Sequence, residues 1–242
     1  MDYGDERSDL AAAFRWTARL NLHESVANHF SVALDAGGRR FLINPNGAHF
    51  SRIRARDLIA LDVDDPDVLA RADAPDPTAW GLHGAVHRGC PHACCVMHVH
   101  SPFATVLASL ADSRLPAIDQ NSAMFFARHV VDEAYGGMAF EAEGARCAAL
   151  LADPAMIAMV MGNHGLLVVG ASVAEAFNRL YYFERAAETY IRALQTGRPL
   201  RVMPDAVADK TAREWAAYPG FARTHLAQLK AILRDEGSDF AD

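Results

Sequence analysis

The sequence predicts an α/β fold in which helices cover both faces of a mixed central sheet that is antiparallel in part. Apolar strands alternate with helical segments along most of the 242 residues, and an early pair of strands is separated by a tight turn. Such a hairpin joins antiparallel neighbours, so the sheet cannot be wholly parallel. No stretch near the middle has the composition of a linker, and we therefore expect one domain over residues 1–242.

The first half of the chain contains two helical patterns and three strand patterns. The hairpin turn is Asp35-Ala-Gly-Gly38. The stretch 64–77 is rich in Asp, Ala and Pro, lacks periodicity and is expected to be a loop. We expect helices at residues 11–22 and 79–88 and strands at residues 27–34, 40–43 and 58–63.

The second half of the chain ends in a long helix and further helical sequence. Ser172 with Glu175 has the pattern of a capping box that opens the long helix, and Gly197 and Pro199 end it near residue 195. We expect strands at residues 94–100, 115–118, 155–161 and 166–169 and helices at residues 102–111, 144–151, 172–195 and 209–234.

Composition and charge narrow the classes of partner. Hydrophobic residues make up 51% of the chain and charged residues 22%, as in ordinary soluble domains. The net charge of −7 and the absence of any basic run argue against nucleic acid and membrane surfaces. The polar start and the short apolar runs do not fit a signal peptide or a membrane span, so we expect a cytoplasmic protein with reduced cysteines.

Two histidines end one apolar strand, and a third follows another. Alternate residues of a strand share a face, so His98 and His100 are expected to point the same way. His164 follows the strand 155–161, between glycines that suit a close backbone approach. Two neighbouring imidazoles and one remote imidazole, with a free position for substrate, fit a catalytic divalent metal. The chain has 11 histidines, so an isolated His-x-His pair would carry little weight.

Several short motifs follow one another along the chain. They are Ala27-Asn-His-Phe-Ser31, Ile43-Asn-Pro-Asn-Gly47, Leu82-His83, His98-Val-His100-Ser-Pro, Gly162-Asn-His-Gly165 and the helix through Tyr181-Tyr-Phe-Glu184. Together they resemble the class II aldolase/adducin superfamily, and its adducin-like bacterial branch in particular. They occur in the family's order over about residues 8–200, which leaves 201–242 as a helical extension.

The resemblance implies a three-layer αβα fold of the class II aldolase type, with a divalent metal held by His98, His100 and His164. The metal would be zinc in most members, and Mn²⁺, Fe²⁺ or Co²⁺ would also suit three imidazoles. The resemblance also implies a small-molecule substrate and a homotetramer with the site at a subunit boundary. In the family's aldolases, the metal polarises a substrate oxygen while a carbon–carbon bond is cleaved or formed.

One departure from the family concerns the catalytic acid/base. The aldolases carry Ser-Ser-Glu-Trp before the helix that leads to His-x-His, whereas this chain has Pro77-Thr-Ala79-Trp80 and lacks the carboxylate. If the alignment holds, Ala79 faces the metal, while Asp76 lies nearby in a different register. Asp119 is a candidate replacement, although Asp119-Gln120-Asn121 is equally typical of a capped turn, and both interpretations stay open.

A second departure concerns the substrate. The aldolases use Gly-Asn-x-Ser in the first strand to bind phosphate, and this chain has Asn28-His29-Phe-Ser31. The replacement argues against a phosphorylated sugar and favours a small oxygenated substrate that carries a carboxylate or no phosphate. The candidate substrate-binding residues are Asn28, His29, Asn44, Gly47, Thr78 and Gln120.

Two functions from different classes fit these residues. The first is a metal-dependent carbon–carbon lyase, either aldolase-like or a decarboxylase. Decarboxylation needs an electron sink more than it needs a base, so the missing carboxylate does not exclude it. The second is an adducin-like binding or scaffold module without catalysis, against which the three retained histidines argue.

Overall fold

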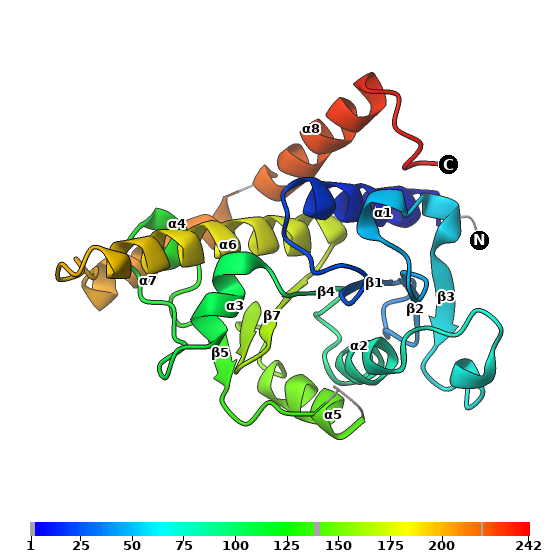
Figure 1. The fold of residues 1–242 in the computed structure, drawn as a ribbon, viewed down its shortest axis with the longest axis horizontal. Helices are drawn as coiled ribbons and strands as arrows, with labels where there is room; N and C mark the ends of the chain where they lie inside the picture. The colour runs from blue at the N-terminus through cyan, green and yellow to red at the C-terminus, as the bar shows by residue number, and fades with distance from the viewer. Residues whose placement is uncertain (1–2, 138–140, 219) are drawn as a thin grey trace.

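The structure, a computed structural model, describes residues 3–137, 141–218 and 220–242. Its centre is a seven-stranded sheet in the order β3-β2-β1-β4-β7-β6-β5 (Figure 1). Neighbouring strands are antiparallel except β5 and β6, which are parallel. The strands are β1 (His29–Ala33), β2 (Arg40–Ile43), β3 (Ile59–Asp62), β4 (Cys95–Val99), β5 (His129–Asp132), β6 (Ala158–Met161) and β7 (Gly165–Gly170).

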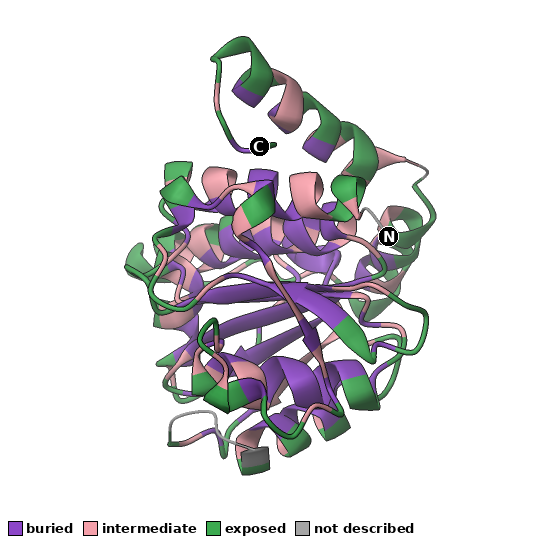
Figure 2. Cartoon of the chain, turned by 90° about the vertical axis from the view of Figure 1, so that its right-hand side faces the viewer, coloured by how far each residue is buried: buried purple, intermediate pink, exposed green. Residues whose placement is uncertain are grey.

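Helices cover both faces of the sheet, which gives the expected three-layer α/β fold. Helices α1, α3 and α6 pack on one face, and α2 and α5 pack on the other (Figure 1). The central strands β1, β4, β6 and β7 are almost wholly buried between these layers, whereas the edge strands β3 and β5 are mostly half-buried (Figure 2). The helices are α1 (Gly4–Arg19), α2 (Pro77–Gly89), α3 (Pro102–Ala108), α4 (Gln120–Ala123), α5 (Glu141–Leu150), α6 (Val173–Gln195), α7 (Asp205–Ala217) and α8 (Phe221–Asp235).

Short 3₁₀ turns at Phe50–Arg52, Ala55–Asp57 and Val68–Ala70 interrupt the loops on either side of β3. The long helix α6 begins as its sequence predicts, because Ser172 accepts a hydrogen bond from the Glu175 backbone N–H at 3.2 Å. None of the described helices is both long and apolar enough to cross a bilayer.

The structure differs from the expected local structure in two respects. Residues 115–118 form no strand; their backbone instead bonds to the His129 ring and to the Met203 N–H. The edge strand β5 and the short helix α4 were not expected, because neither has enough residues to show a period. The expected helical region 209–234 is confirmed and consists of two helices, of which the second begins at Gly220 with a left-handed φ of 73°.

Candidate metal centre

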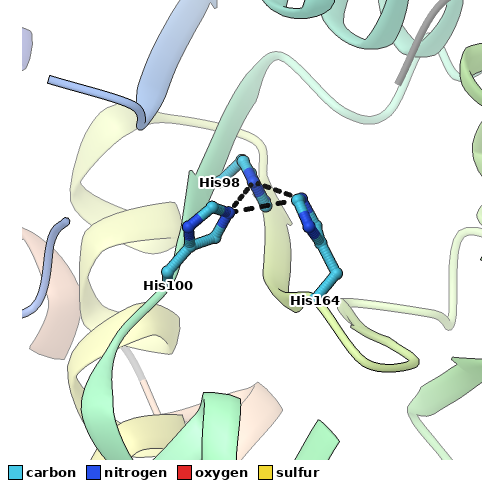
Figure 3. A group of neighbouring side chains, drawn as sticks. All are labelled: His98, His100 and His164. Atoms are coloured by element: carbon cyan, nitrogen blue, oxygen red, sulfur yellow. Dashed lines mark hydrogen bonds between the residues drawn. The ribbon is translucent and has the colours of Figure 1, made fainter. Parts of the chain in front are cut away.

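The end of β4 and the turn between β6 and β7 bring three imidazoles together (Figure 3). Strands β4 and β7 are antiparallel neighbours, so the last residues of β4 meet the first residues of β7. The Nε2 atoms of His98 and His100 lie 3.1 Å apart. The Nε2 atom of His164 lies 3.1 Å from that of His98 and 3.2 Å from that of His100. The three histidines that the sequence predicted to converge therefore do so.

The turn that carries His164 depends on unusual backbone geometry. Asn163 has a left-handed φ of 55°, which Asn tolerates better than most residues. A Cβ atom on Gly165 would lie 2.5 Å from the Val99 carbonyl oxygen and 2.9 Å from His100 Cδ2. Glycine is therefore required at residue 165 for β7 to approach the end of β4 so closely.

The other ring nitrogens of two of these histidines are fixed by acceptors. His98 Nδ1 lies 3.0 Å from the Leu166 carbonyl oxygen, and His100 Nδ1 lies 2.5 Å from Glu24 Oε2. A carbonyl or carboxylate oxygen can only accept, so both Nδ1 atoms carry the proton and both Nε2 atoms present a lone pair. Such partners are typical of metal-ligating histidines.

The donor set fits a divalent metal ion. Two lone pairs 3.1 Å apart repel one another unless a cation lies between them. Nitrogen atoms bound to one tetrahedral zinc ion are separated by about 3.3 Å, close to the separations found here. The three imidazoles thus have the spacing that a divalent metal requires, and His98 and His100 also have the required tautomer.

Burial favours the neutral, metal-binding form of these rings. Burial lowers the pKa of His98 well below its usual range, and the neighbouring His29 and His100 add to the effect. Burial also lowers the pKa of His164 to about 4. Neutral imidazole is the form that binds a metal, so protons compete weakly at these two residues.

Sequence reasoning missed Glu24. It lies in the loop between α1 and β1, with its side chain 65% exposed, and it reaches a histidine 76 residues away. Asn28 holds this loop in place, because its Oδ1 accepts hydrogen bonds from the Glu24 N–H at 2.7 Å and from the His100 N–H at 3.3 Å. No local motif marks Glu24, so only the fold could have found it.

A chain of four buried polar side chains leads away from the imidazoles. His29 Nδ1 lies 2.8 Å from His83 Nε2, and Ser31 Oγ lies 2.5 Å from His83 Nδ1 and 2.7 Å from His87 Nε2. The His29 ring lies 4.9 Å from the His98 ring, centroid to centroid. Burial lowers the pKa of His29 to about 3, of His87 to about 4, and of His83 well below its usual range. The chain is therefore neutral, and each ring donates through one nitrogen only.

The other residues expected to bind substrate lie around the loops next to β1, β2 and α2. Asn44 Oδ1 accepts from the Phe30 N–H at 3.1 Å, and Asn44 Nδ2 approaches the Asn28 carbonyl oxygen at 3.4 Å. Gly47 has a φ of 72°, and a Cβ atom there would contact nothing within 4 Å. Thr78 donates from Oγ1 to Asp76 at 2.5 Å.

The expectation that Ala79 faces the imidazoles is not supported. Ala79 is buried in an apolar cluster with residues of β2 and β3, including Phe41 and Leu61. Asp76 begins the same helix and accepts from the backbone N–H groups of Thr78 at 2.8 Å and Ala79 at 3.3 Å. The charge on Asp76 opposes the fall in the pKa of His29.

Asp119 and Gln120 lie at the start of α4. The Asp119 carboxylate accepts from the Ser122 N–H at 2.7 Å and the Ser122 hydroxyl at 2.6 Å, so it caps the helix. The Gln120 carbonyl accepts from the Trp215 indole N–H at 2.9 Å. Within the described residues, no hydrogen bond or ion pair links either one to the three imidazoles.

Tyr135 packs against the imidazole cluster from outside. Its ring stacks on His164 with centroids 4.6 Å apart. Its hydroxyl group is buried and has no hydrogen-bond partner within the described residues. Burial raises the pKa of this phenol far above its usual range, so the hydroxyl keeps its proton and remains a free donor beside a candidate metal ligand.

A mixed sheet between two helical layers, with three imidazoles at the end of β4, defines a protein of the class II aldolase type. A sequence model described as the class II aldolase and adducin N-terminal domain matches residues 8–191, and the chain belongs to this family.

Proteins of different kinds are similar to this chain in sequence or in structure. The chain is 27% identical over 239 residues to decarboxylase NovR of Streptomyces niveus, covering 93% of this chain and 87% of that protein. It is 25% identical over 191 residues to rat (Rattus norvegicus) alpha-adducin, covering 78% of this chain and 25% of adducin. A crystal structure of an aldolase II superfamily protein from Pseudomonas syringae is 30% identical, with a TM-score of 0.86, and covers 99% of this chain and 96% of that one.

Proposed function

We propose that this protein is a metal-dependent carbon–carbon lyase that acts on a small oxygenated substrate bearing a carboxylate. The observation that carries the proposal is the pair of Nε2 lone pairs, on His98 and His100, held 3.1 Å apart by acceptors on the opposite ring nitrogens. Two unpaired lone pairs in contact lower the stability of the folded protein. A scaffold that binds no metal gains nothing from this arrangement.

In this proposal His98, His100 and His164 hold the ion, with zinc the expected metal. When bound, the metal would act as a Lewis acid that stabilises negative charge on a substrate oxygen. Among the residues around it, Asn28 orders the Glu24 loop through its side-chain oxygen, and its Nδ2 is a buried donor without a partner in the described chain. That N–H group is suited to bind a substrate oxygen.

We further propose that His29 contacts the substrate. Its Nδ1 is engaged by His83, and its ring lies beside His98 at the edge of the site. Since the chain from His29 to His87 is neutral, His29 would offer a hydrogen bond without placing a second positive charge beside the metal. Asn44, Gly47 and Thr78 are proposed to line the far side of the substrate.

Two routes of bond cleavage remain to be separated by experiment. The likeness to a decarboxylase favours the decarboxylative route. Metal-loaded protein should be incubated with 3-oxo acids, whose loss of carbon dioxide leaves an enolate that a metal can stabilise, and with 4-hydroxy-2-oxo acids, whose carbon–carbon cleavage releases an aldehyde. Release of carbon dioxide and of aldehyde is measured in parallel. We expect carbon dioxide release that His100→Ala abolishes. Turnover by His100→Ala at the parental rate would contradict the proposal.

The second candidate is an adducin-like binding module, which family membership keeps open. It predicts a protein whose folding and binding do not depend on stoichiometric metal. Protein that retains no divalent ion and gains no stability from added zinc would favour this alternative.

A further inference from the structure

A cavity of about 390 Å³ lies at the end of strands β6 and β7 that is opposite to the imidazoles. Ile157 leads into β6 and Ser172 follows β7, whereas His164 lies in the turn at the other end of both strands. The first turns of α6 and the facing ends of α7 and α8 form its walls. This cavity is therefore separate from the candidate metal centre.

The lining of the cavity carries an excess of positive charge. Three of its side chains are guanidinium groups, those of Arg128, Arg179 and Arg223, and one is a carboxylate, that of Glu175. The whole chain has a net charge of −7, so the positive charge of this cavity is opposite in sign to the net charge of the chain. Such a local field attracts anions.

The two inner arginines are incompletely paired. Arg179 donates to the Val169 carbonyl oxygen at 2.5 Å and to Glu175 Oε2 at 3.2 Å. The Arg128 side chain, which is half-buried, makes no hydrogen bond or ion pair with the described residues. Burial lowers the pKa of both groups, and the charge of Arg128 further lowers that of Arg179. Burial and the charge of Arg128 thus destabilise the Arg179 guanidinium, while Glu175 offsets part of this effect, and a bound anion would stabilise both arginines.

Two further features favour an anion with an attached ring. The first turn of α8 lines the cavity, and no side chain caps its free N–H groups. The rings of Trp215 and Phe221 lie 5.5 Å apart on the same wall and offer an apolar surface. We propose that this cavity binds an oxyanion, carboxylate or phosphate, that is attached to an aromatic or other apolar group.

The test uses phenyl phosphate and inorganic phosphate as probes at constant ionic strength. Binding is followed by calorimetry and by the fluorescence of Trp215, which lines the cavity. The test variant is Arg128→Gln, and the matched control is Arg201→Gln, at an exposed position outside the cavity. Arg223→Gln, at an exposed position on α8, is a second test variant in case Arg128→Gln fails to fold.

We expect one saturable site per chain that binds phenyl phosphate more tightly than inorganic phosphate. Arg128→Gln should weaken binding about tenfold or more, because a charge-assisted hydrogen bond is lost, and Arg223→Gln should weaken it less. Arg201→Gln should bind like the parent. The proposal is overturned if no saturable binding occurs, or if the parent, the Arg128→Gln protein and the Arg223→Gln protein bind the probe equally.

Discussion

Glu24 contacts the imidazole cluster through a direct hydrogen bond to His100. Its carboxylate accepts from His100 Nδ1 at 2.5 Å, which fixes the tautomer that leaves Nε2 free. A carboxylate in this position also makes the ring a stronger donor to a metal. The Glu24 side chain is 65% exposed, so its contribution acts through this one hydrogen bond and is moderated by solvent.

We expect Glu24→Gln to weaken metal binding by about 10- to 100-fold, as loss of a carboxylate behind a ligand histidine commonly does. Competition with a chromophoric chelator measures the affinity. Glu214→Gln, an exposed glutamate on α7, is the control and should leave the affinity unchanged. An unchanged affinity in the Glu24 variant would show that this hydrogen bond does not govern the site.

A second prediction concerns the effect of His87 on how the stability of the protein depends on pH. Burial lowers its pKa in the folded protein to about 4 from an ordinary 6.5. Below pH 6.5, therefore, His87 binds a proton in the unfolded chain, whereas in the folded chain it binds one only as the pH reaches about 4. Stability from this residue is complete above pH 6.5 and is lost as the pH falls towards 4, by up to about 3 kcal/mol.

His87→Phe removes this titration, and its ring can still stack on Phe41. The free energy of unfolding of the parent, minus that of the variant, should fall between pH 6.5 and pH 4 in urea titrations. A difference that stays constant over this range would mean that His87 is not held neutral in the folded protein.

At the scale of elements, a buried carboxylate on α6 determines where α3 begins. Glu184 is 4% exposed and accepts from the Ser101 hydroxyl at 2.6 Å and from the N–H groups of Phe103 at 2.8 Å and Ala104 at 2.9 Å. These groups follow His100 directly, so Glu184 ties the metal-bearing end of β4 to the long helix.

We expect Glu184→Ala to lower the free energy of unfolding by about 3 kcal/mol, because three buried donors lose their acceptor. Glu188→Ala, one turn further along the same helix, removes only surface ion pairs and should cost less than about 1 kcal/mol. Chemical unfolding of both variants makes the comparison. Equal losses would contradict the assignment of Glu184 as the acceptor that holds α3.

The elements that could be predicted are those with a clear period or cap. The hairpin of β1 and β2, the strand that carries His98 and the helix from Ser172 all had such a signal, and the structure confirms them. Residues 115–118 were expected to form a strand and do not, whereas β5 forms a strand that was not expected. Both segments have only four residues, which is too short to show a hydrophobic period. The orientation of Ala79 could not be predicted from the sequence motif, because it depends on how α2 packs on β2 and β3.

At the scale of the whole molecule, the C-terminal helix α8 packs on the helical layer that covers one face of the sheet. It lies against α1 and α6 (Figure 1). Phe240, which follows α8, is fully buried. We therefore propose one domain over residues 1–242, with 201–242 as an extension. Tyr181 and Tyr182, on the long helix α6, pack within the chain on His225 and Trp215.

We nevertheless propose a homotetramer, on the basis of family membership and of apolar groups exposed on the described surface. Leu194, Val202, Val207 and Tyr218 are between 41% and 64% exposed near α7. Light scattering at micromolar concentration should give four times the mass of the 26.3 kDa chain. A monomer mass would refute the proposal, and Val207→Lys should shift the protein towards smaller species.

The central claim is that three histidines hold one divalent ion. Its most direct measurement is the metal content of protein stripped with chelator and reloaded with zinc, by elemental analysis alongside calorimetry. We expect one ion per chain in the parent and in His92→Ala, a control histidine outside the cluster. His98→Ala and His164→Ala should each lose tight binding, since two imidazoles remain. Zinc bound at the parental stoichiometry and affinity in both of these variants, or no zinc bound in the parent, would contradict the account.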